Sequence, residues 1–195
     1  MLAAYPWLLS TLPDKSATVI IPKLLAPLIN KGILKEAVHC RIATASISED
    51  GFEMIMSRLP RKCTVHIVTG LHSPTNPNVL YRILEEYSDR VELKVFSLNV
   101  FHANVYQFDL PYRKGIAFVS SGPLTIGGLQ KNEELTVQVE DEKEVEEIRR
   151  WFTRYFETSS ELTKKLVDEY APLFVVAKER ENLSREEIAG LVSSK

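Results

Sequence analysis

The alternation of strand-like runs with helical patterns is the feature that most constrains the fold of this chain. Three runs rich in branched and apolar residues cover positions 37–47, 63–70 and 91–98. Between them, residues 48–59 and 77–87 carry apolar side chains at helical spacing, and Asn76 suits a helix cap. Strands that alternate with helices are typical of layered α/β proteins. We therefore predict an α/β fold.

The second half of the chain predicts a hairpin, an edge strand and a long helix. Residues 100–109 and 115–121 are strand-like, and the segment between them, with its Pro, basic pair and Gly, suits a hairpin connection. Residues 133–140 alternate polar and apolar side chains, as in an exposed strand. A helix is expected from Asp141, with Glu144 as its capping-box partner.

Length and composition predict one domain in a reducing compartment. The 195 residues are 45% hydrophobic, which is enough for one sizeable core. Cys40 and Cys63 are too few and too far apart for a disulfide framework or a zinc knuckle, so we expect buried free thiols and a cytoplasmic protein. Residues 1–12 are apolar but short and interrupted by Pro6, so we expect them to pack into the core rather than form a signal peptide or membrane span.

The net charge limits the possible binding sites, and the sequence pattern suggests how the chain divides. The net charge of −2 gives no global attraction to nucleic acid or anionic lipid, so any polyanion site must be a local basic patch. We divide the chain into a domain at 1–160 and a C-terminal helical extension at 161–195. That extension has its own capping pair, Ser184 and Glu187, and either begins a further module or is a terminal helix.

One block of sequence carries a resemblance to a known family. From His102 the chain reads HANVYQFD, and after the expected hairpin it reads VSSGPLTIGGLQKNEEL. This resembles the phospholipase D superfamily, whose signature is His-x-Lys-x4-Asp, a hairpin, Gly-Ser-x-Asn and a downstream Asn-x-Glu. It is most similar to the small single-motif nuclease branch, related to the phospholipase D-like domains of some restriction endonucleases. The resemblance covers residues 35–157 and implies a mixed, mostly parallel sheet flanked by helices on both faces.

The resemblance assigns roles to five residues of the motif. His102 takes the place of the nucleophile, and Asp109 that of the motif aspartate. Ser121 matches the motif serine, while Asn132 and Glu134 match the downstream pair. Taken alone, His102 would more simply be a structural strand histidine, and only the aligned block makes it a candidate site residue.

Three motif positions depart from the family pattern. Asn104 stands in place of the lysine, Pro123 in place of the asparagine, and Ser120 in place of the glycine. In the family mechanism one histidine attacks phosphorus and a second protonates the leaving oxygen, with no metal or cofactor. The lysine and asparagine stabilise charge that develops in the transition state. Asn104 has no charge and Pro123 has no donor, so we expect weakened hydrolysis.

Basic residues near the motif are the candidates for phosphate binding. Arg113 and Lys114 lie at the tip of the expected hairpin, where they are either solubility charges or contacts to a phosphate backbone. Lys131 lies beside the motif and is the best candidate for a displaced cation.

A single motif implies a dimer. The triplet His39-Cys40-Arg41 is the only other His-x-basic sequence, but position 46 is Ser rather than Asp, so it is not a second motif. In the single-motif branch a symmetry mate supplies the second histidine. The resemblance therefore implies a homodimer with two His102 side chains facing across the two-fold axis.

Three functions remain open on sequence grounds. The first is a metal-independent phosphodiesterase or endonuclease with weakened activity. The second is a catalytically inactive nuclease-fold dimer that serves as a nucleic-acid-binding or assembly module. The third, ranked last, is a lipid phosphodiesterase, because the sequence shows no amphipathic membrane surface. We expect nucleic acid as the partner, with DNA ahead of RNA, and no membrane. Whether the protein is an enzyme is left undecided.

Overall fold

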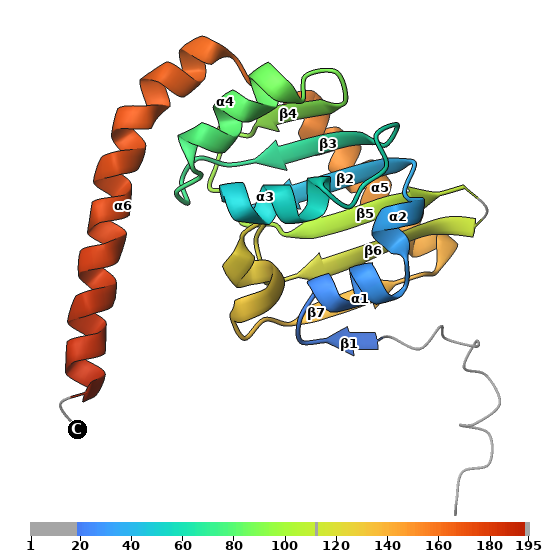
Figure 1. Ribbon diagram of the computed structural model, residues 1–195, viewed down its shortest axis with the longest axis horizontal. Helices are drawn as coiled ribbons and strands as arrows, with labels where there is room; N and C mark the ends of the chain where they lie inside the picture. Colours follow the sequence, from blue (N-terminus) through green and yellow to red (C-terminus); the bar gives the residue numbers. More distant parts are fainter. Residues whose placement is uncertain (1–18, 112, 194–195) are drawn as a thin grey trace, which may run out of the picture.

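The chain forms one eight-stranded mixed sheet with helices on both of its faces (Figure 1). The structure is a computed structural model that describes residues 19–111 and 113–193. Across the sheet the strands follow the order β1-β7-β6-β5-β2-β3-β4-β8. The expected core packing of residues 1–12 concerns a segment outside the described residues.

The elements have the following bounds. The strands are β1 (Val19–Ile21), β2 (His39–Thr44), β3 (Thr64–Thr69), β4 (Val91–Val95), β5 (Val105–Leu110), β6 (Arg113–Ser120), β7 (Thr136–Val139) and β8 (Ser160–Glu161). The helices are α1 (Leu25–Asn30), α2 (Ile33–Glu36), α3 (Glu49–Met56), α4 (Pro77–Glu86), the π-helix η2 (Gly127–Lys131), α5 (Glu142–Thr158) and α6 (Lys164–Ser193).

The pairing of the strands confirms the mixed sheet and corrects one detail. Among the eight strands, only β2, β3 and β4 pair in parallel, and all other neighbouring strands run antiparallel. The sheet is therefore not mostly parallel. The connections explain the difference, because α3 and α4 provide the crossovers that parallel strands need, whereas β5 and β6 are joined by a tight hairpin.

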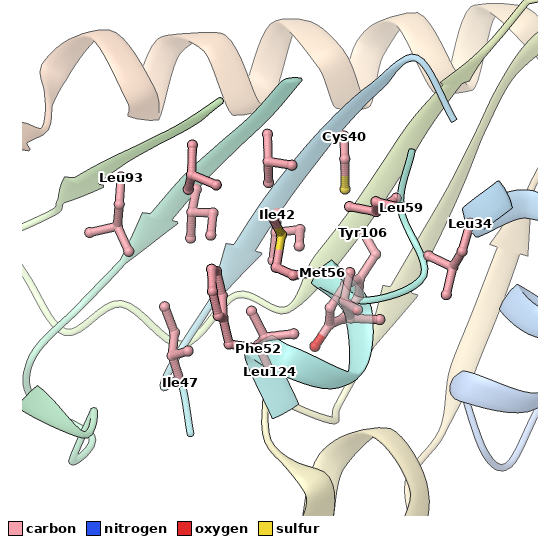
Figure 2. Packing of buried hydrophobic residues seen from close by; sticks show 14 of the residues in the cluster. Leu34, Cys40, Ile42, Ile47, Phe52, Met56, Leu59, Leu93, Tyr106 and Leu124 are labelled. Atoms are coloured by element: carbon pink, nitrogen blue, oxygen red, sulfur yellow. The ribbon is translucent and has the colours of Figure 1, made fainter. Parts of the chain in front are cut away.

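The larger core lies between the sheet and α1–α4 (Figures 1 and 2). Phe52, Ile55 and Met56 come from the inner face of α3 and are at most 2% exposed. They pack in the same cluster as Tyr106 and Phe108 of β5, which are fully buried. Burial of each such side chain contributes roughly 1.5–3 kcal/mol, so this face fixes β5 in the middle of the sheet.

Polar side chains cap three of the helices that the sequence predicted. The Ser48 hydroxyl accepts a hydrogen bond from the Gly51 amide at the start of α3. Asn76 does the same for the Asn78 amide in α4, and the Asp141 carboxylate accepts from the first-turn amides of α5. Each cap satisfies amides that have no partner within the helix, so these starts are encoded locally.

The opposite face of the sheet is covered by α5. The Phe156 ring stacks on the His66 ring of β3 with centroids 4.8 Å apart, and the Lys94 ammonium lies 4.6 Å from the same phenyl centroid. Next to His66, the imidazole of His39 makes an edge contact at 4.6 Å and a 2.6 Å hydrogen bond with Thr64. Two histidines thus form part of the surface on which α5 packs.

The last helix, α6, runs along one side of the domain (Figure 1). It is fastened near its start: the Tyr170 hydroxyl donates to the Thr75 carbonyl and accepts from the Thr75 amide, both at 3.0 Å. Tyr81 of α4 donates to Asp168 at 2.7 Å, and Pro172 lies inside the helix just beyond this anchor. None of the described helices is both long and apolar enough to cross a membrane.

His39 is expected to make the fold sensitive to acid. Burial, assisted by the charge of Arg41 and by His66, lowers the pKa of His39 from 6.5 to about 4. The unfolded chain therefore takes up a proton before the folded chain does, and stability falls as the pH drops from about 6.5 to 4. Because His39 is only half-buried, we expect a loss of about 1–2 kcal/mol.

Urea unfolding of the wild type, His39→Gln and His72→Gln at several pH values measures this contribution. His39→Gln should flatten the dependence between pH 6.5 and 4, whereas His72→Gln, which changes an exposed loop histidine, should keep it. Equal pH dependence in all three proteins would contradict the assignment.

Candidate active site

One edge of the sheet gathers the motif residues because β5 runs antiparallel to β2. In this register Ala43 pairs with Val105, so residues 102–104 lie beside the end of β2, where the parallel strands β2 and β3 also end. Ser120 and Ser121, at the end of β6, reach the same edge, since Val119 pairs with Val105. Most of the motif thus meets where the parallel strands end.

At this edge Asn104 connects the ends of β2 and β6 through hydrogen bonds of its side chain. Its side-chain oxygen accepts from the Ala45 amide at 3.0 Å and from the Thr44 hydroxyl at 3.2 Å. Its amide group donates to the Ser121 carbonyl at 3.1 Å, and its own carbonyl accepts from the Ser120 amide at 2.8 Å. Asn104 is 5% exposed. The side chain in the lysine position therefore ties β2 to β6 and presents no charge to solvent.

His102 is exposed and lies outside the regular strand. The sequence placed it on a strand that starts at residue 100, whereas β5 begins at Val105. The neighbouring Phe101 explains this late start, because its ring leaves the strand path to pack against Phe96 and Tyr155, with centroids 5.5 and 5.8 Å away. Among the described residues, none makes a hydrogen bond to the His102 imidazole. The ring is accessible to a substrate, and no described group of the same chain orients it.

Ser121, Asn132 and Glu134 come together as the motif predicts. The Ser121 hydroxyl donates to one carboxylate oxygen of Glu134 and accepts from the Leu135 amide at 3.0 Å. Asn132 donates to the other oxygen of Glu134 at 3.3 Å. Both carboxylate oxygens are thereby held, and the carboxylate is fixed at the site edge by the two polar partners that the family signature names.

A lysine from the beginning of the chain fastens this loop. The Lys23 ammonium donates to the Lys131 carbonyl at 3.1 Å and to the Asn132 carbonyl, and it forms a 3.1 Å ion pair with Glu133. Sequence reasoning missed Lys23, and no local pattern marks it, since more than a hundred residues separate the partners. Lys131 itself is exposed at the end of η2, and its ammonium has no partner among the described residues.

The loop that contains Pro123 is tightly closed. A Cβ atom added to Gly128 would lie 2.4 Å from the Pro123 carbonyl oxygen, so only glycine allows this approach. The following residue is anchored on both sides: the Leu124 amide donates to the Thr44 hydroxyl at 2.8 Å, and its carbonyl accepts from Ser48 at 3.1 Å. Pro123 lies in a rigid turn without a side-chain donor.

Asp109 is not part of this cluster. It lies five residues beyond Asn104 along β5, which corresponds to about 16 Å of strand. There it forms 2.8 Å ion pairs with Arg41 of β2 and Arg149 of α5. Burial would raise the pKa of Asp109, but the hydrogen bonds and charges of Arg41 and Arg149 outweigh it and lower the pKa. The motif aspartate thus fastens α5 to the sheet.

The basic hairpin also lies away from the motif histidine. Arg113 begins β6 and pairs with Leu110, at the opposite end of the strand from Ser120. The backbone of Lys114 follows it, and the side chains of both basic residues are outside what the structure describes. In the described ranges, no three His, Cys, Asp or Glu side chains gather into a metal-binding group.

Comparison with protein families decides the relationship. A family model described as "Cardiolipin synthase, PLD-like domain" matches residues 32–156. The chain belongs to this phospholipase D-like family. A search among curated proteins finds no match.

Several solved structures share the fold. NucT from Helicobacter pylori is 17% identical with a TM-score of 0.55, and the match covers 74% of this chain and 97% of that one. Nuc from Salmonella typhimurium, a phospholipase D family member, is 14% identical with a TM-score of 0.56, over 74% and 98% of the two chains. The phosphatidylserine synthase of Haemophilus influenzae is 10% identical with a TM-score of 0.58, over 83% of this chain and 43% of that one. At these identities the likeness shows the fold alone.

Asn104 is expected to stabilise the fold as well as the site. Asn104→Ala removes three side-chain hydrogen bonds and leaves buried groups at the ends of β2 and β6 without partners. We expect a loss of about 1–3 kcal/mol in the free energy of unfolding. The control is Asn78→Ala, which removes an exposed amide, and it should cost much less. Equal losses in urea unfolding would show that Asn104 is not a structural connection.

Proposed function

We propose that this chain is a phospholipase D-superfamily nuclease-like domain that acts on or binds nucleic-acid phosphodiesters without metal. The assembly of Ser121, Asn132 and Glu134 at the sheet edge that also carries His102 is the observation that supports this most directly. NucT and Nuc, the second of which is a phospholipase D family member, share this fold over nearly their whole length, which supports a role of the same kind.

In the proposed reaction His102 is the nucleophile. A ring nitrogen bonds to phosphorus as the bond from phosphorus to the leaving oxygen breaks, and that oxygen takes a proton from the second copy's His102. Water then attacks the phosphohistidine, gives its proton to the same second histidine, and releases His102. The missing lysine charge and the missing donor at Pro123 weaken stabilisation of the phosphoryl oxygens, each at a cost of roughly a hundredfold to a thousandfold in rate.

An inactive binding or assembly module is the second candidate. The buried, fully bonded oxygen of Asn104 favours it, because this side chain is built into the sheet edge rather than aimed at a substrate. In this alternative the dimer keeps phosphate recognition, through Lys131, Arg113 and Lys114, and has lost turnover. The two candidates differ in cleavage and not in binding.

We also propose a cellular compartment, a domain boundary and a preferred nucleic acid. Cys40 and Cys63 are buried free thiols, which suits a reducing cytoplasm. We also propose that the nuclease-type unit ends near residue 160 and that residues 161–195 form an extension, since the family match ends at residue 156. We expect DNA to be preferred over RNA.

A cleavage assay with excess EDTA distinguishes the two candidates. The substrates are a generic phosphodiester and DNA, and the variants are His102→Ala and His72→Ala. We expect slow cleavage that resists EDTA, disappears in His102→Ala and persists in His72→Ala, which changes a loop histidine outside the motif. DNA binding without cleavage would support the inactive module. Cleavage that survives in His102→Ala would come from a contaminant.

We also expect the protein to form a two-fold dimer with the candidate active site at the two-fold axis. Sedimentation should give twice the chain mass of 22.2 kDa. In His102→Cys, a short thiol crosslinker should join two chains, because both native cysteines are buried and unreactive. The control is His72→Cys, which should not crosslink efficiently. A monomer, or a dimer in which position 102 does not crosslink, would remove the composite site.

A further inference from the structure

A cleft of about 530 Å³ separates α6 from the loops at the site edge. Its inner wall comes from the loops that follow β2, β3 and β6 and combines the polar residues Ser46, Ser73 and Thr125 with apolar ones such as Ile47 and Pro123. Asn132, which holds the Glu134 carboxylate, also lines the cleft, so the cleft borders the candidate site at this residue. The outer wall is contributed by α6.

We propose that this cleft binds a single strand of nucleic acid beside the site and that Lys178 and Arg185 of α6 hold its phosphates. The inference rests on the proposed function, because it assigns the substrate class and a binding surface to the same site. It goes beyond the family, whose model ends at residue 156, before α6 begins.

The residues of α6 that line the cleft share one face of the helix. Phe174, Lys178, Glu181 and Arg185 follow each other at intervals of four, three and four residues, which places them in one row. Phe174, Lys178 and Glu181 are partly buried, whereas Arg180 between them is exposed on another face. The helix thus turns an aromatic ring and two cations toward the site edge.

The outer wall is positioned by the anchor at the start of α6. Tyr170 bonds both backbone groups of Thr75, and the Thr75 hydroxyl accepts from the Ile47 amide at 3.2 Å. Ile47 and Ser73, on either side of this anchor, both line the cleft. Hydrogen bonds to the loops that form the inner wall therefore hold the start of α6 next to the part of the helix that forms the outer wall.

This combination of groups suits a single strand. Lysine, arginine and hydroxyl side chains are the usual contacts to phosphate oxygens. Proteins that bind single strands add an aromatic ring on which a base stacks, and Phe174 can take this place. A base paired in a duplex is already stacked on both sides, so a stacking ring favours the unpaired strand.

Glu181 forms ion pairs with both Lys178 and Arg185 when no ligand is bound in the cleft. Its carboxylate pairs with Lys178 at 2.8 Å and with Arg185 at 2.6 Å. The hydrogen bond from Lys178 is the main cause of the lowered pKa of Glu181, so the carboxylate is ionised near neutral pH. A bound phosphate has to displace this carboxylate from the cations. Removal of its charge should therefore strengthen binding.

Binding of a labelled oligodeoxythymidine by the full chain, measured against salt concentration, tests the inference. The double variant Lys178→Ala/Arg185→Ala should bind about tenfold more weakly at low salt, and its salt slope should fall by about 0.7 for each lost phosphate contact. The matched control is Lys165→Ala/Arg180→Ala, which removes the same charges from α6 outside the cleft and should have a much smaller effect.

Glu181→Gln provides a result that misfolding cannot imitate, because it should bind more tightly than the wild type. Equal loss in the two double variants, no gain in Glu181→Gln, or tighter binding of a duplex than of the single strand would overturn the cleft assignment and leave the proposed function standing. A wild-type protein that binds neither DNA nor RNA at low salt would instead refute the proposed function and the cleft with it.

Discussion

The antiparallel pairing of β5 with β2 is the constraint on which the rest of the site depends. The parallel strands β2 and β3 end at one edge of the sheet, and an antiparallel β5 has to begin there. His102 and Asn104 precede β5, so they arrive at the same edge as Ser121. A parallel β5 would place them at the opposite end. The buried rings of Tyr106 and Phe108 pack β5 into the core beside β2.

Local chemistry explains which parts of the fold could be predicted from sequence. The starts of α3, α4 and α5 are marked by capping side chains within a few residues of the amides that they satisfy. Elements α1, α2 and β1 lack such marks and were not predicted. The start of β5 was placed too early because Phe101 is apolar in either context. Only the aromatic contacts with Phe96 and Tyr155 show that it leaves the strand.

The candidate site shows the same division. The resemblance to the phospholipase D superfamily assigned Ser121, Asn132 and Glu134 to one site, and the structure joins these three residues by hydrogen bonds. The motif could not show that Asp109 lies far along an extended strand, where it forms an ion pair with Arg149. The hydrogen bonds of Lys23 could not be predicted from the sequence, because they depend on how residues near Lys23 pack against η2. The sequence thus named candidate residues, whereas their partners depend on contacts between distant parts of the chain.

The proline in α6 has a mechanical consequence. Pro172 has no amide hydrogen for the preceding turn, so the helix bends more easily at this point than elsewhere. It follows directly on the Tyr170 anchor, and the helix beyond it is about 31 Å long at 1.5 Å per residue. A bend of about 10° at Pro172 would move the far end of α6 by about 5 Å, given that length. Because Phe174, Lys178 and Arg185 lie beyond Pro172, such a bend would change the width of the cleft beside the candidate site.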